Sequence, residues 1–232
     1  ADPDAGFSFA MPDPARFTAA LARLGVGPDS RVVVYDDDAR MWSTRLWWAL
    51  REIGLETVAV LDGGWPAWVA AGGPVESGPP EPADPLPEGA GWGEPPAARG
   101  TFVGRQEVLD IVERGDPGRV LVCALSADVF RGVASPIPYA RPGHIPGSRN
   151  LPAKDTLLDA DGRFRPLPEL AAALAGLPAD AEVVAYCGGG ISATLLAFAL
   201  TLVGRDRVRI YDGSLEEWAA DPDLPLVVGP EE

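Results

Sequence analysis

The stretch Val183-Val184-Ala185-Tyr186-Cys187-Gly188-Gly189-Gly190-Ile191-Ser192-Ala193 decides the fold of this chain. It opens with a short apolar run that contains β-branched residues, which predicts a buried strand. The three glycines predict a tight loop, and the apolar segment 191–204 predicts a helix that ends at a glycine. Strand, loop and helix in this order predict a parallel sheet flanked by helices, so we assign the chain to the α/β class.

A second copy of this pattern lies about 150 residues earlier in the chain. Residues 32–36 (VVVYD) match residues 183–187 (VVAYC), and residues 61–68 (LDGGWPAW) match residues 211–218 (YDGSLEEW). The offsets are 151 (187 minus 36) and 150 (212 minus 62). Shared order and shared spacing indicate a duplicated domain.

Glycine and proline are concentrated between the two copies. Of the 29 residues in segment 72–100, 15 are glycine or proline. This density disfavours both helices and strand pairing, so it predicts a linker. We therefore predict a first domain over residues 1–78, a linker over 79–100 and a second domain over 101–232.

Charge and composition exclude several classes of function. The 232 residues include 34 acidic and 19 basic side chains, for a formal net charge of −15, which disfavours nucleic acid and membrane surfaces as partners. One histidine and two cysteines are too few for a zinc site of the Cys/His type. Apolar stretches are too short to span a bilayer, and no targeting segment is visible. We expect a soluble protein, cytoplasmic by default, with no metal or organic cofactor.

Cys187 is the candidate catalytic residue. Consecutive glycines let backbone N–H groups turn toward one centre, and the start of the following helix adds partial positive charge. Such a loop binds an anion and favours the thiolate form of a cysteine. The alternative interpretation is a small buried hydrophobic residue at a strand end. The candidate anion-binding loop comprises Gly188, Gly189, Gly190, Ile191 and Ser192.

Other functions of a cysteine or a glycine-rich loop fit the sequence less well. A cysteine-dependent phosphatase needs an arginine six residues after the cysteine, where this chain has Ala193. A papain-like enzyme needs a histidine base, and the single histidine, His144, lies in a turn-rich segment typical of a structural corner. Dinucleotide binding stays open, because Gly188-x-Gly190-x-x-Ala193 is trailed by Asp212. Two features count against dinucleotide binding. Only 20 residues follow Asp212, too few to complete a mononucleotide-binding half, and the duplicate loop 36–40 has no glycine.

Four sequence blocks together resemble the tandem-domain rhodaneses, the thiosulfate and 3-mercaptopyruvate sulfurtransferases. They are residues 143–150 (GHIPGSRN), 186–193 (YCGGGISA), the DGGW block at 62–65 and the DGSxxxW block at 212–218. The resemblance implies two homologous domains, with Cys187 as nucleophile in the second and Asp36 in its place in the first. It also implies that the thiolate takes sulfane sulfur from a small-molecule donor, becomes a persulfide, and passes the sulfur to cyanide or a thiol.

The details of the resemblance separate two activities. The loop is similar to the mercaptopyruvate type, Cys-Gly-Ser-Gly-Val-Thr-Ala, although Gly189 replaces the serine. The thiosulfate type carries basic residues after the cysteine. The family also usually has arginines where this chain has Leu125 and Val129. We nominate Arg131 and Arg141 as substitutes that bind the donor.

Loss of the two arginines leaves an alternative, which is a weakly active or inactive sulfur carrier or docking protein. Cys123 stands where the family usually has Asp, and we expect it to be a buried structural thiol. The resemblance further implies another strand, helix and turn before residues 12–17, so we expect a first domain that is incomplete at its N-terminus. The exposed sheet edge would then need a cover, from a homodimer contact or another partner.

Overall fold

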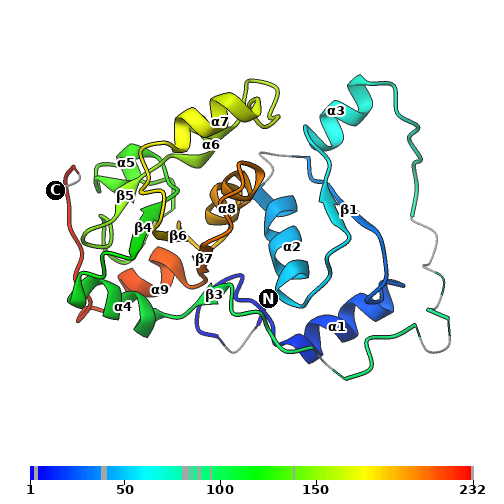
Figure 1. Ribbon diagram of the computed structural model, residues 1–232, viewed down its shortest axis with the longest axis horizontal. Coiled ribbons are helices and arrows are strands. Elements are labelled where there is room, and N and C mark those ends of the chain that lie inside the picture. Colours follow the sequence, from blue (N-terminus) through cyan, green and yellow to red (C-terminus); the bar gives the residue numbers. More distant parts are fainter. Residues whose placement is uncertain are drawn as a thin grey trace.

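The computed structural model describes residues 1–2, 5–37, 41–79, 84, 86–87, 90–94, 96–137 and 139–230. Figure 1 shows two α/β units side by side, a smaller one from the first part of the chain and a larger one from the second. Both have parallel strands flanked by helices, which confirms the predicted α/β class. The helices in the described residues are all too short or too polar to cross a membrane.

The smaller unit is built around two strands. β1 and β2 pair in parallel, with Val32 opposite Val58 and Val34 opposite Val60. Helix α1 begins after Asp13, whose side chain accepts a hydrogen bond from the backbone N–H of Arg16 and so caps the helix. In chain order the elements are α1 (Pro14–Arg23), β1 (Val32–Val34), α2 (Met41–Glu52), β2 (Val58–Val60) and α3 (Gly64–Ala70).

The larger unit contains a five-stranded parallel sheet in the order β3-β7-β6-β4-β5. Strand β6 lies in the middle, between β4 and β7. From β4 the chain continues to β5 on one side of the sheet, and from β6 it continues to β7 on the other side. Connections that diverge in this way favour a ligand site at the carboxyl ends of the two strands. The elements are β3 (Phe102–Val103), α4 (Arg105–Arg114), β4 (Arg119–Cys123), α5 (Ala127–Phe130), β5 (Arg149–Asn150), α6 (Ala153–Leu157), α7 (Leu167–Leu174), β6 (Glu182–Tyr186), α8 (Ser192–Leu202), β7 (Val208–Tyr211) and α9 (Ser214–Ala220).

Side chains of β6 alternate between the two faces of this sheet, as the period of a strand requires. Val183 and Ala185 pack against α6, α7 and α8. Val184 and Tyr186 pack on the opposite face, against α4, α5 and α9. Because both faces are covered, residues 183–186 of the strand are all apolar and buried, which is the pattern expected of a buried parallel strand.

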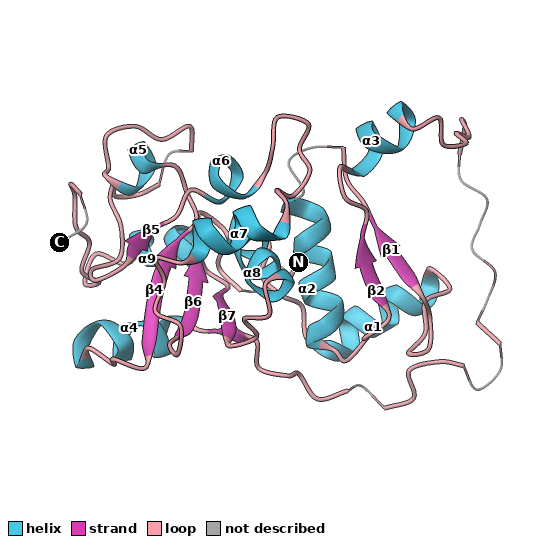
Figure 2. Ribbon diagram, turned by 45° about the horizontal axis from the view of Figure 1, so that its top comes forward, coloured by secondary structure: helices cyan, strands magenta, loops and turns pink. Residues whose placement is uncertain are grey.

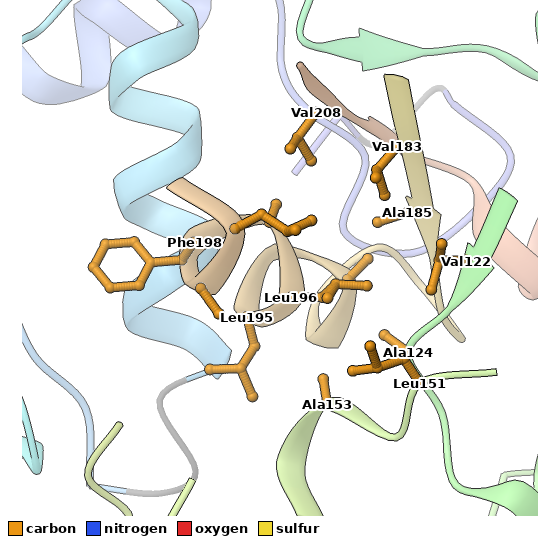
Figure 3. Close-up of a cluster of buried hydrophobic side chains, with 14 of the residues drawn as sticks. Val122, Ala124, Leu151, Ala153, Val183, Ala185, Leu195, Leu196, Phe198 and Val208 are labelled. Atoms are coloured by element: carbon orange, nitrogen blue, oxygen red, sulfur yellow. The ribbon is translucent and has the colours of Figure 1, made fainter. Parts of the chain in front are cut away.

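Helix α8 is buried between the large sheet and helix α2 of the smaller unit, as Figures 1 and 2 both show. In Figure 3 Phe198 lies on the side of α8 that faces α2, and the strand residues Val183 and Val122 lie on the other side. The rings of Phe198 and Trp47 of α2 meet edge to face, with centroids 4.8 Å apart. A helix that is apolar all round needs such a position between two layers.

An ion pair joins the two units. Arg45 of α2 donates from Nη2 to Asp212 Oδ1 at 2.6 Å and to the carbonyl oxygen of Phe9 at 2.7 Å. Its Nη1 donates to the carbonyl oxygen of Gly190 at 3.2 Å. The side chains of Arg45 and Asp212 are only 10% and 14% exposed. The smaller unit therefore holds the loop that follows Cys187.

The segment between α3 and β3 contains no helix or strand among its described residues. Residues 80–83, 85, 88–89 and 95 of the predicted linker lie outside the described part of the chain. Trp92 donates from Nε1 to the carbonyl oxygen of Val26 at 2.9 Å, so this part of the segment runs along the smaller unit. The domain boundaries at 1–78, 79–100 and 101–232 stay a prediction.

Replacement of Arg45 by Ala should lower the free energy of unfolding by about 3 kcal/mol, because it leaves the buried Asp212 carboxylate without its cation. Urea denaturation followed by circular dichroism measures this loss. The control is Arg114→Ala, because that side chain is 76% exposed and should change the stability by no more than about 0.5 kcal/mol. Equal losses in the two variants would contradict the role of Arg45 between the units.

Candidate active site

Cys187 directly follows β6, at the carboxyl end of the central strand of the large sheet. Its backbone N–H donates to Ser214 Oγ at 3.0 Å, and its carbonyl oxygen accepts from the N–H of Leu215 at 3.1 Å. Ser214 Oγ in turn donates to the carbonyl oxygen of Tyr211 at 2.8 Å. The start of α9 therefore sets the position of the cysteine backbone.

A cleft of about 600 Å³ lies over Cys187. The cysteine is only 2% exposed, yet it lines this cleft, so the cleft is a route to its sulfur. Both units contribute walls. The lining residues are Ser8, Phe9, Met41, Trp42, Leu125, Ile137, Tyr139, Ala140, Cys187, Gly188, Gly189, Ile191, Ser192 and Glu216.

The carbonyl groups of the loop are bound by protein donors. Those of Cys187 and Gly188 accept from Leu215 and Glu216 of α9. The carbonyl of Gly190 accepts from Arg45, and that of Ile191 accepts from Thr194. Each bound carbonyl orients its peptide plane within the protein.

The N–H groups of the same loop have no such acceptors. In the described part of the chain, the backbone N–H groups of residues 188–192 donate no hydrogen bond. In a trans peptide the N–H points opposite to the preceding C=O, so carbonyls that are bound inside the protein turn the amides the other way. Four amides and the start of α8 are therefore available to an anion at Cys187.

The glycines of the loop have close neighbours. Gly190 has a φ of +74°, and a Cβ there would lie 2.6 Å from the carbonyl oxygen of Asp212. The hydroxyl of Tyr139 occupies the space that a Cβ at Gly188 would need. A Cβ at Gly189 would lie 3.1 Å from Glu216 Oε2. The backbone neighbour and the positive φ therefore require glycine at position 190, whereas a side chain at 188 or 189 would have to displace Tyr139 or Glu216.

Tyr139 and Glu216 are cleft residues that the sequence analysis did not identify. Tyr139 lies in an irregular segment that carries no motif, and Glu216 occupies an unassigned position within the DGSxxxW block. Burial raises the pKa of Tyr139, and the neighbouring Cys187, Cys123 and Glu216 raise it further, so its hydroxyl stays a hydrogen-bond donor. Only the fold brings these two side chains to the loop.

The two nominated arginines do not line the cleft. The Arg141 guanidinium donates to the carbonyl oxygens of Ala219, Trp218, Leu224 and Asp221, at and beyond the end of α9. Arg131 is exposed at the end of α5. That they bind the donor stays a prediction, and neither side chain lines the cleft over Cys187.

The other residues that the sequence analysis considered, His144, Cys123 and Asp36, make contacts within the protein. His144 is buried, stacks on Phe130 with ring centroids 3.6 Å apart, and shares a hydrogen bond at Nδ1 with the carbonyl oxygen of Phe130. Cys123 is fully buried in the core, and burial raises its pKa to about 12. Asp36 Oδ2 accepts from the N–H of Ser43, but residues 38–40 of that loop lie outside the described residues.

The chain is similar to proteins of one family. The Rhodanese-like domain family matches residues 8–71 and 126–221. The chain is 39% identical over 232 residues to a probable 3-mercaptopyruvate sulfurtransferase of Pseudomonas aeruginosa, with 94% of this chain and 75% of the relative covered. It is 36% identical over 219 residues to a putative thiosulfate sulfurtransferase of Mycobacterium tuberculosis, with coverages of 93% and 73%.

A solved structure shares the fold. It is the anaerobic ergothioneine biosynthesis enzyme from Chlorobium limicola in complex with trimethyl histidine, with a TM-score of 0.84 and 25% identity. The match covers 98% of this chain but 57% of that enzyme, so the chain spans little more than half of its length. Matches to one domain family in both units, together with relatives above 30% identity over most of their length, decide against the dinucleotide-binding alternative. The chain belongs to the rhodanese-like family, with two rhodanese-like domains.

Proposed function

We propose that the chain is a sulfurtransferase that carries the transferred sulfur on Cys187 as a persulfide. The sulfur comes from 3-mercaptopyruvate or thiosulfate and goes to a thiol or cyanide. The observation that carries this proposal is that the backbone N–H groups of residues 188–192 donate no hydrogen bond in the described part of the chain, beside a cysteine that lines the cleft. The names of the curated relatives, all sulfurtransferases, support the same reaction.

The first half of the reaction forms the persulfide. The Cys187 thiolate attacks the sulfur of 3-mercaptopyruvate, the carbon–sulfur bond breaks, and its electron pair passes to the carbon. The thiol proton of the donor ends on that carbon, which gives pyruvate and a deprotonated persulfide. Amides of residues 188–192 stabilise this anion. In the second half, cyanide or a thiolate takes the outer sulfur and the Cys187 thiolate is restored.

The cleft favours 3-mercaptopyruvate over thiosulfate as donor. Thiosulfate is a dianion, and the described residues that line the cleft include no lysine or arginine that could neutralise its second negative charge. The loop likewise has no basic residue directly after the cysteine. 3-Mercaptopyruvate carries one negative charge, so its transfer from water into the cleft costs less free energy than the transfer of thiosulfate.

A second candidate is a sulfur carrier or docking protein with weak or no turnover. Leu125 lines the cleft and Val129 is buried, at positions where the family usually carries arginine. A cleft without these cations binds an anionic donor poorly. Formation of the persulfide without turnover would favour the carrier, and formation of neither product would favour a docking role.

The remaining expectations about the molecule belong to the same proposal. They are a cytoplasmic location, substrates that are small molecules rather than nucleic acid or membrane, and a homodimer contact or another partner that covers the first domain.

Incubation with 3-mercaptopyruvate should add one sulfur atom to Cys187, because the loop amides stabilise the persulfide. Intact mass spectrometry detects the added sulfur, and a thiocyanate assay after addition of cyanide measures its transfer. Cys187→Ser should lower turnover by more than about 1000-fold. If the serine variant still took up sulfur, the nucleophile would be misassigned.

Alkylation of the native protein at about pH 9 should modify Cys187 and spare Cys123. Burial raises the pKa of Cys123 to about 12, so that thiol stays protonated in the folded protein. Peptide mass mapping after iodoacetamide treatment checks this, and denatured protein, in which both thiols react, is the control. Equal labelling of the two cysteines in the native protein would contradict the assignment of Cys123 to the core.

A further inference from the structure

Glu216 gives the cleft a negative charge. Among the lining residues that the structure describes, Glu216 is the carboxylate, and these residues include no lysine, arginine, histidine or aspartate. The other walls are apolar side chains, glycine backbone and serine hydroxyls. A charged ligand in this cleft therefore interacts electrostatically with the carboxylate of Glu216.

Several contacts hold this carboxylate against the catalytic loop. The backbone N–H of Glu216 donates to the carbonyl oxygen of Gly188 at 2.8 Å. Its Oε1 accepts from the N–H and Oγ of Ser8 at 2.9 and 2.8 Å. Its Oε2 lies 3.1 Å from the position that a Cβ at Gly189 would take. The second oxygen is thus directed at the backbone next to Cys187.

The charge of Glu216 is not neutralised by its partners. The donors on Oε1 both belong to Ser8 and are neutral. Within the described ranges, no lysine or arginine pairs with this carboxylate. The cation nearest the loop is Arg45, which reaches the carbonyl of Gly190 and is itself paired with Asp212. An arginine already bound to a carboxylate offsets little of a second one.

We propose that Glu216 determines the charge preference of the cleft among sulfur acceptors, so that it favours a thiol with a cationic head group, such as an aminothiol, over a thiol with an anionic head group. The aromatic rings of Phe9 and Trp42, with centroids 5.2 Å apart on the same cleft, suit an ammonium group as well. This inference rests on the proposed function and deepens it by naming the substrate class. The loop amides hold the sulfur, and Glu216 selects the group attached to it.

The charge preference can be measured without turnover. Two methanethiosulfonate reagents, one with a trimethylammonioethyl group and one with a sulfonatoethyl group, react with Cys187 by the same step. The thiolate attacks the sulfenyl sulfur, a mixed disulfide forms, and methanesulfinate leaves. Cys123 is fully buried, and Cys187→Ser gives the background. The ratio of the two rate constants, cation over anion, reports the field at the sulfur.

Glu216→Gln should lower this ratio roughly tenfold, because it removes the charge of a carboxylate that lines the same cleft as the reacting sulfur, while it keeps an oxygen for Ser8. The matched control is Glu113→Gln on α4, which removes the same charge at an exposed position outside the cleft and should leave the ratio unchanged. In the wild-type protein, added salt should lower the ratio toward that of a small free thiol. A ratio that responds to neither the Gln variant nor salt overturns the inference.

A turnover experiment separates this inference from the proposed function. Protein loaded with persulfide is mixed with 2-aminoethanethiol, 2-mercaptoethanol or mercaptoacetate, and intact mass spectrometry follows the loss of sulfur. Glu216→Gln should slow the cationic acceptor and speed the anionic one, each compared with the wild-type rate for the same thiol. If the reagent ratio depends on Glu216 but no persulfide ever forms, the proposed function falls and the charge preference stands. If persulfide forms and acceptor rates are insensitive to Glu216, the inference falls alone.

Discussion

The binding of the loop carbonyls is the constraint on which the rest of the site depends. Donors from α9, from α8 and from Arg45 hold the carbonyl groups of residues 187, 188, 190 and 191 inside the protein. Peptide planarity then points the corresponding amides away from these donors, and none of them donates a hydrogen bond within the described part of the chain. Gly190 is essential to this arrangement, because its φ is positive and the carbonyl oxygen of Asp212 lies where its Cβ would be.

The smaller unit is part of the site even though its own copy of the loop has Asp36 in place of a cysteine. It provides Phe9, Met41 and Trp42 as cleft walls and Arg45 as a donor to the loop. Its helix α2 also covers α8, which is apolar on all sides and would otherwise face water. Duplication has thus produced one site from two units, with one unit carrying the thiol and the other orienting the loop around it.

The site separates two electrostatic tasks within one cleft. In the proposed mechanism, backbone amides, which carry no net charge, stabilise an anionic sulfur without attracting other anions from a distance. The carboxylate of Glu216 acts on whatever group accompanies that sulfur. The reaction and the substrate preference thus depend on different groups. A fold can then keep its chemistry while a change of one side chain alters its choice of substrate.

The amino-acid sequence by itself determined the α/β class, the duplication, the buried strand before Cys187 and the apolar helix after it. These features depend on periodicity and on glycine positions, which act over a few residues. Tertiary structure alone decided that Arg141 binds the carbonyls around the end of α9, and that Arg45, Tyr139 and Glu216 meet at the loop. Arg45 and Gly190 are 145 residues apart in sequence, and no local pattern encodes such a contact. Their meeting follows from the packing of α2 on α8, which depends on the shapes of many side chains at once.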